Sequence, residues 1–351
     1  MFNKLIQRLF SAFSQNRRQP DYEAFVKLRA KEQDLQHSAL SAVSSSTAKP
    51  SLEFVDKTQK LDLLFYNYLF GESVDSQKQD PLSDFVCSKV QMQLKDPANV
   101  LENLPVLPAS VTQVLTLLNK DDFNLDNLLK IVEREPAMAG ALIQQANSAQ
   151  YRQANQQVMN LKQAFMTLGA TGVRETILKQ FFKQLTPADN LYYKFFGQKI
   201  WNHTHSVADI CQKLAESQVS PPQNGSAYFV GLFHALGKMI IFQFMVEAFH
   251  FVSPDSQPSS EAFKQLIQTY HKQLTLQVAE YWNLPQSVLA ALKYEVNADE
   301  GDLKLCLAEA INLSKLISLY KARVIDEDEY YNYCRYFRLS DDALDIAEDS
   351  I

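Results

Sequence analysis

A few polar side chains stand in or beside apolar segments, where they could bind a ligand. Gly237-Lys238 could contact a phosphate, although a close helix approach at Gly237 with Lys238 reaching solvent is the simpler interpretation. Asn147-Ser148 could bind a ligand, but both residue types also bond local backbone groups and so end or cap helices. Arg174 could pair with an acid across two halves of the chain or bind an anionic ligand.

Other kinds of site have no support in the sequence. The chain has no G-x-S-x-G, G-x-x-x-x-G-K-[ST] or G-x-G-x-x-G segment, so these hydrolase and nucleotide-loop signatures are absent. It has four cysteines, and the two closest, Cys306 and Cys334, are 28 residues apart, which does not fit a zinc ribbon. We expect reduced, mostly buried thiols in a cytoplasmic protein.

Apolar residues recur at helical spacing along most of the chain, and no segment alternates for long enough to be a strand. Nine glycines in 351 residues also argue against a doubly wound nucleotide fold and against an all-β fold. The sequence therefore predicts an all-α protein. After residue 50 the expected helices cover 52–70, 82–95, 108–119, 125–133, 136–149, 160–168, 171–185, 190–217, 226–250, 259–270, 272–282, 285–295 and 303–320.

The most apolar segment, Tyr228–Val246, could be mistaken for a membrane span. It is 19 residues long but contains His234, Lys238 and Gln243, and a charged side chain is costly at the centre of a bilayer. We therefore predict a buried helix or helix pair in the core of the protein.

The N-terminal 96 residues divide into three parts. Residues 1–36 are predicted to form amphipathic and polar helices, 37–51 a Ser-rich linker and 52–96 a helical extension. Residues 1–13 place apolar side chains on one face and basic ones on another, without the clean apolar run of a signal peptide. This helix could dock on the protein itself or on a partner, or it could make peripheral contact with an anionic membrane surface.

The formal net charge of −6 comes from the C-terminal end. Residues 326–351 contain nine acids and two arginines, so the rest of the chain is nearly neutral and offers no broad basic surface for nucleic acid. Residues 321–351 are expected to form an acidic tail that is either solvated or bound to a partner. Ser340 before Asp341 and Asp342 is typical of the N-cap of a last short helix.

Six segments occur in an order and spacing that are more specific than any one of them. They are LPVLPASVTQVLTLL (104–118), EREPAMAGALIQQANSAQY (133–151), LKQAFMTLGATGVRETIL (161–178), WNHTHSVA (201–208), GLFHALGKM (231–239) and AEYWNLPQSVLAALKYEV (279–296). Together they resemble the HDOD domain family, found in bacterial signalling proteins and related to metal-dependent HD phosphohydrolases. The resemblance covers residues 97–320 and implies an N-terminal helical subdomain over 97–186 and a degenerate HD-like subdomain over 187–320. Glu135 departs from the usual Asp of a D-P-A run.

The resemblance also implies where catalytic HD relatives hold a metal, with a His, a His-Asp pair and a later Asp. His203 falls at the first His and His234 at the His of the pair, but Ala235 stands in place of the Asp, and a methyl group cannot ligate. Lys315 falls near the final Asp, where a cation would repel a metal. Glu295 is the remaining candidate ligand, near a later His-His position of some relatives. Two imidazoles without a carboxylate suit a hard divalent metal poorly.

The other histidines are not expected to complete this site. His205 points to a different helical face from His203, and His250 and His271 are expected to be isolated and peripheral. We therefore interpret His203 and His234 as core histidines that hydrogen-bond across two helices, and we expect no cofactor and no catalytic residue.

The resemblance implies a non-catalytic bacterial signalling or regulatory protein that binds an unidentified protein partner or senses a ligand such as a small nucleotide. The candidate contact residues are Asn147, Ser148, Arg174, Lys238 and Glu295. A first alternative is a divergent metal-dependent phosphohydrolase acting on a nucleotide or phosphorylated signal, with Glu295 or Asp209 as a replacement ligand. A second is a small-molecule sensor that uses the cavity left by the lost metal.

Overall fold

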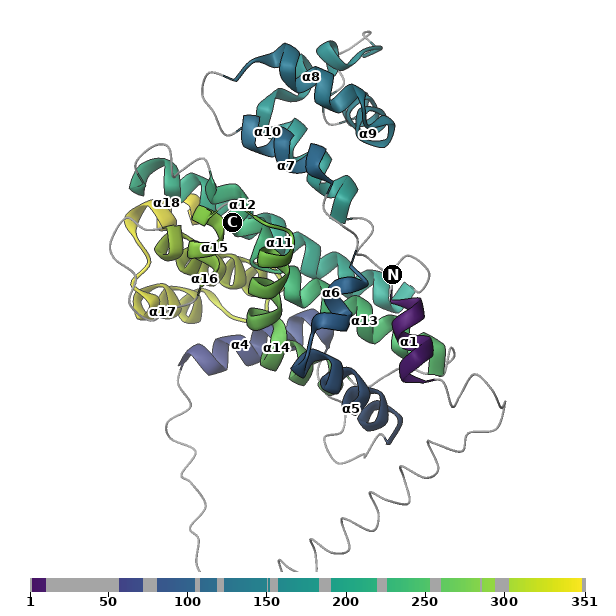
Figure 1. The fold of residues 1–351 in the computed structure, drawn as a ribbon. Coiled ribbons are helices and arrows are strands. Elements are labelled where there is room, and N and C mark those ends of the chain that lie inside the picture. The colour runs from purple at the N-terminus through teal and green to yellow at the C-terminus, as the bar shows by residue number, and fades with distance from the viewer. Residues whose placement is uncertain are drawn as a thin grey trace, which may run out of the picture.

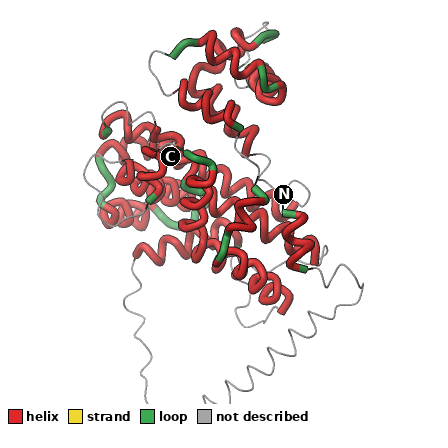
Figure 2. Tube along the Cα trace, viewed as in Figure 1, coloured by secondary structure: helices red, strands yellow, loops and turns green. Residues whose placement is uncertain are grey.

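The computed structural model describes residues 2–10, 57–71, 81–104, 108–118, 123–149, 151, 157–182, 191–219, 226–252, 260–284, 286–293 and 303–348. Over these ranges the chain forms helices and connecting turns without a strand, as Figure 2 shows, so the predicted all-α class is confirmed. The polar segment over 21–36 and the Ser-rich linker over 37–51 lie outside the described residues, so the structure gives no test of them.

The helices are numbered as in Figure 1. They are α1 (Asn3–Leu9), α4 (Lys57–Phe70), α5 (Pro81–Lys95), α6 (Ala98–Glu102), α7 (Ala109–Leu118), α8 (Leu125–Glu133), α9 (Pro136–Ala146), α10 (Leu161–Phe182), α11 (Leu191–Gln218), α12 (Ala227–Phe233), α13 (Leu236–Val252), α14 (Ser260–Tyr281), α15 (Gln286–Leu292), α16 (Leu303–Lys321), α17 (Glu327–Phe337) and α18 (Asp341–Glu348).

Helices α7 to α10 form a group set apart from the other helices in Figure 1, which we call the small lobe; helices α11 to α16 are the large lobe. Asn124 caps α8, because its side chain accepts a hydrogen bond from the backbone N–H of Asn127 at 3.0 Å, and Pro136 begins α9. The sequence predicts two helices here, and α10 is two helical segments that meet at a kink where the backbone of Gly169 is not helical. The φ of +65° there is a conformation that glycine adopts readily.

Helices α12 and α13 form the centre of the large lobe, and almost all their side chains are buried. The stretch Ala227–Val252 is long and apolar enough to cross a membrane, yet its most apolar window is entirely buried inside the protein. This arrangement is the predicted buried helix pair. The two helices are separated at His234-Ala235. His234, one of the two histidines of the candidate site, therefore lies at the junction between them.

Two glycines let neighbouring helices approach α12 and α13 closely. A Cβ atom on Gly231 would lie 2.5 Å from the Cα of Ala208 in α11, and one on Gly237 would lie 2.0 Å from the carbonyl oxygen of His271 in α14. Neither distance is possible for a real side chain, so the close helix approach predicted at Gly237 is present. These contacts fix where the helices place their polar side chains.

The N-terminal helix α1 is docked on the large lobe. Phe2 and Ile6 are buried, the Phe2 ring lies 4.8 Å from that of Phe244, and the Phe2 backbone N–H donates to Glu247 at 2.7 Å. The polar face, including Arg8, is exposed. Of the alternatives for this segment, docking on the protein's own body is therefore the one the structure contains.

The acidic C-terminal segment folds onto the large lobe instead of standing free as a tail. Tyr330 and Tyr333 of α17 and Ala343 of α18 are buried, and apolar side chains therefore hold both helices in place. The predicted N-cap is present, because Ser340 Oγ accepts a hydrogen bond from the Ala343 backbone N–H at 3.2 Å. Ser217 of α11 also donates a hydrogen bond to Asp342 at 2.7 Å.

Candidate functional site

The two histidines singled out from the sequence come together in the large lobe. His203 of α11 and His234 have ring centroids 5.7 Å apart, and both are almost fully buried. His203 Nδ1 lies 2.9 Å from Ser314 Oγ of α16, and His234 Nδ1 donates to the carbonyl oxygen of Gly231. The Nε2 atom of each ring is buried without a hydrogen-bond partner. Burial lowers the pKa of both rings, that of His234 to about 3, so both are neutral at pH 7.

Basic side chains surround this histidine pair. Lys238 of α13 is 5% exposed, and burial, followed by the charge of Lys315, lowers the pKa of its amine to about 7. Lys315 of α16 is itself largely buried, and its Nζ atom lies 2.5 Å from a carboxylate oxygen of Asp62. Asp62 belongs to α4, which places a carboxylate beside the cluster and packs the Phe65 ring 4.5 Å from the His203 ring.

These residues do not fit the metal centre of catalytic HD relatives. The described part of the chain contains no group of three or more His, Cys, Asp or Glu side chains that could hold a metal ion. Ala235 offers no ligand atom, and the nearest charged groups are Lys238 and Lys315. A divalent cation would be repelled by both amines, so the site as built favours an anion.

Two sequence-based expectations about this region are wrong. Lys238 was expected to reach solvent, and His271 to be isolated and peripheral, yet Lys238 is buried and His271 is 8% exposed beside it. Lys238 is buried because neighbouring helices cover every side of α13 from Leu236 to Val246, and the approach of α14 at Gly237 places His271 against α13. His250 is exposed, as expected of a peripheral residue.

Arg174 joins the two lobes. Its guanidinium donates to Gln212 of α11 at 3.0 Å and to the carbonyl oxygen of Leu118 at 3.1 Å, and it lies over the rings of Tyr228 and Phe229. Arg174 therefore reaches across two halves of the chain, as one interpretation expected, but its partners are an amide and a carbonyl rather than an acid. These bonds use both terminal nitrogens of the guanidinium, whereas its Nε atom is buried without a hydrogen-bond partner.

Asn147 is a structural residue at the end of α9. Its side-chain amide donates to the carbonyl oxygens of Ile143 at 2.9 Å and Val158 at 2.8 Å, and its oxygen accepts from the Val158 backbone N–H at 2.9 Å. The adjacent Ser148 Oγ is buried and has no partner. Asn147 is therefore engaged within the protein, whereas the neighbouring Ser148 hydroxyl is not.

We expect Asn147→Ala to lower the free energy of unfolding by about 2–3 kcal/mol, because three hydrogen bonds are lost and the backbone groups of Val158 are left unpaired. Ser148→Ala is the matched control and should change stability by no more than about 0.5 kcal/mol. Urea unfolding of both variants measures the difference. Equal losses would show that Asn147 does not organise this turn.

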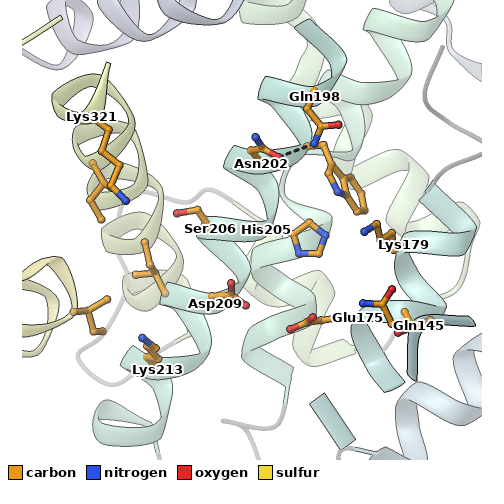
Figure 3. A pocket seen from close by; sticks show the side chains of 15 residues that line it. Gln145, Glu175, Lys179, Gln198, Asn202, His205, Ser206, Asp209, Lys213 and Lys321 are labelled. Carbon is orange, nitrogen blue, oxygen red and sulfur yellow. Dashed lines mark hydrogen bonds between the residues drawn. The ribbon is translucent and has the colours of Figure 1, made fainter. Parts of the chain in front are cut away.

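A second candidate site is a pocket of about 690 Å³ between the lobes, shown in Figure 3. Its polar lining combines amides, lysines and carboxyl groups from α9, α10, α11 and α16; the labelled residues are Gln145, Glu175, Lys179, Gln198, Asn202, His205, Ser206, Asp209, Lys213 and Lys321. Because both signs of charge line it, the pocket selects neither a purely anionic nor a purely cationic ligand.

Two residues weighed from the sequence lie in this interlobe pocket rather than beside His203. His205 contacts the Trp201 ring with centroids 4.4 Å apart, which confirms that it uses a different helical face. Asp209 lies near Glu175, and burial raises the pKa of both carboxyl groups. The structure therefore does not bring Asp209 to the histidine pair as a replacement metal ligand. Glu295 lies outside the described residues.

Sequence reasoning missed the part that α4 plays. Asp62, Phe65 and Asn67 reach the large lobe from a helix outside the segments of the family resemblance, and Asn67 accepts a hydrogen bond from buried Lys264 at 2.7 Å. No local signal in the sequence pairs Asp62 with Lys315, 253 residues away. The available signal was the pattern of the helix itself. Asp62 is an acid on its polar side, and the other face is aromatic.

Comparison with known proteins identifies the domain family of the chain. The sequence model of the HDOD domain matches residues 104–298, which is more than half of the chain. An uncharacterised protein of Treponema pallidum is 17% identical over 204 residues, and the match spans 39% of that relative's length.

Several solved structures match the chain at low sequence identity. An HDOD domain protein of unknown function from Geobacter sulfurreducens has a TM-score of 0.49 and 18% identity, over 74% of this chain and 93% of that one. A Shewanella amazonensis protein provisionally named a metal-dependent phosphohydrolase has the same TM-score and identity, over 77% and 98%. The MmoQ response regulator of Methylococcus capsulatus has a TM-score of 0.33 and 18% identity, over 70% and 97%.

Proposed function

Because the chain belongs to the HDOD domain family, we propose that it is a regulatory protein of a signalling pathway whose helical body binds a partner or ligand without catalysing hydrolysis. The observation that supports this proposal is the absence, among the described residues beside the histidine pair, of the metal-binding carboxylates that the family resemblance implies. Where a metal would need carboxylates, the histidine pair is accompanied by Ala235, Lys238 and Lys315.

The alternative of a divergent phosphohydrolase has less support. A metal-activated water needs an open coordination position and ligands that neutralise the charge of the metal. Among the described residues, the carboxylate beside this cluster is Asp62, which is already paired with Lys315. Asp209 is in the interlobe pocket. The same cluster of amines would instead attract an anion.

The docked position of α1 bears on whether this helix could contact a membrane surface. The apolar side chains of this helix would have to leave the core before they could enter a membrane surface, at a cost set by the area they bury. We therefore place the interaction with a partner on the helical body and leave peripheral membrane contact through residues 1–13 out of the proposal.

Metal analysis tests the proposal directly. Elemental mass spectrometry of the full chain, purified without chelator or metal-affinity resin, should find less than about a tenth of an equivalent of iron, manganese or zinc. The reason is that the two Nε2 atoms are accompanied by amines, and the Asp62 carboxylate beside the cluster is already paired with Lys315.

The double variant His203→Ala, His234→Ala is the control for that measurement. About one or two equivalents of metal in the natural chain, lost together with phosphatase activity in the double variant, would overturn the non-catalytic proposal. Residual metal that is equal in both proteins would be bound elsewhere and would leave the proposal standing.

A further inference from the structure

We propose that Lys315 and Lys238 form a binding site for a phosphate-type oxyanion and that the Asp62 carboxylate of α4 occupies the ligand's place in the unliganded protein. This inference rests on the proposed function, since it names the class of ligand that the degenerate site would take. The ligand would be inorganic phosphate or the phosphoryl group of a small metabolite.

The cluster carries an excess of positive charge. The amine of Lys315 lowers the pKa of Lys238, whereas Asp62 raises it, so one carboxylate faces two amines. Lys238 lies in the protein interior, where charges are weakly screened, and Lys315 lies between it and the solvent. A buried cation is costly without a counter-charge, and one carboxylate does not balance this cluster.

The cluster also contains buried histidine nitrogens that have no hydrogen-bond partner in the protein. His203 Nε2, His234 Nε2 and His271 Nδ1 are each buried without a partner, and all three histidines border Lys238. Because His234 Nδ1 donates to a carbonyl oxygen, its neutral ring leaves a lone pair on Nε2. A phosphate group offers both acceptor oxygens for the lysines and, when singly protonated, a donor for this nitrogen.

The side chain of Asp62 can be displaced without moving its helix, α4. The side chain is 40% exposed, and Lys315 is 11% exposed, so their ion pair lies at the solvent edge of the cluster. Other contacts hold α4 in place: Phe65 and Leu61 are buried, and the backbone carbonyl of Tyr68 accepts a hydrogen bond from Lys199 at 2.5 Å. Rotation of one carboxylate toward water would therefore open Lys315 to an oxyanion of similar size.

Calorimetric titration of the full chain with inorganic phosphate tests the proposal. Asp62→Asn keeps the shape of the side chain and removes the competing charge, so this variant should bind phosphate at least about tenfold more tightly than the natural chain. The double variant Asp62→Asn, Lys315→Met should lose that gain.

Two controls make the result specific. Asp62→Asn, Lys321→Met changes a lysine on the same helix that lines the interlobe pocket, and it should keep the gain in affinity. Lys60→Gln removes an exposed charge from α4 and should leave phosphate affinity unchanged. Thermal unfolding of each variant verifies that it is folded before the titration is interpreted.

The outcomes separate this inference from the proposed function. Unchanged affinity in folded Asp62→Asn, or a gain that survives Lys315→Met, overturns the anion site while leaving a non-catalytic scaffold intact. Metal-dependent release of phosphate from phosphate esters, abolished by His203→Ala, would instead overturn the proposed function. Tighter binding without hydrolysis supports both.

Discussion

Gly237→Ala is expected to lower the free energy of unfolding by about 3 kcal/mol or more. A methyl group at this position would lie 2.0 Å from the carbonyl oxygen of His271 and 2.9 Å from its Cα. The obstacle is backbone, which no rotamer change can remove, so α13 and α14 would have to separate. Separation would disrupt the most buried layer of the large lobe.

Gly140→Ala is the matched control for that experiment. Gly140 lies within α9, and a Cβ atom there would meet nothing within 4 Å. Since alanine stabilises helices more than glycine, this variant should gain up to about 1 kcal/mol. Guanidinium unfolding followed by circular dichroism compares the two. A loss under about 1 kcal/mol in Gly237→Ala would show that the helices do not approach so closely.

The close approach at Gly237 is one of the features of the fold that could be predicted from the sequence. Helical spacing predicted most of the helices and the close approach at Gly237, because periodicity and residue size are local properties. Spacing did not give the burial of Lys238, which follows from the neighbours that cover every side of α13 over Leu236–Val246. It also did not give Asp62, whose partner Lys315 is far away in the chain. The motifs located the histidine pair, while its charge environment is a property of tertiary packing.

Lys238→Met is expected to stabilise the protein by about 2–4 kcal/mol at pH 6, although it removes a side chain from the proposed anion site. Burial lowers the pKa of the Lys238 amine from 10.5 to about 7. Below pH 7 the amine is charged in both folded and unfolded chains, and the folded protein bears the full cost of burying it. Between pH 7 and 10.5 the unfolded chain binds more protons, so the stability of the natural protein rises with pH. The advantage of the variant should therefore shrink from pH 6 to pH 9.

Lys264→Met separates this effect from a general preference for apolar side chains. Lys264 is 3% exposed, close to the 5% of Lys238, but its amine donates to Asn67 at 2.7 Å and lies 3.9 Å from Glu261. Replacing it should destabilise the protein, because these contacts are lost. Urea unfolding at pH 6, 7.5 and 9 compares the variants; a loss of stability in Lys238→Met at pH 6 would contradict the argument.

A stabilising Lys238→Met would also bear on why the lysine is present. A side chain that lowers stability and that a common apolar residue could replace is retained for a reason other than folding. Beside it lie three histidine nitrogens without partners, which an oxyanion could engage, and the Lys315 amine, which the Asp62 carboxylate of a separate helix occupies in the unliganded protein. Phosphate should accordingly stabilise Asp62→Asn in thermal unfolding and should have no such effect once Lys238 is also methionine. The stability cost and the binding site would then be two properties of one buried amine.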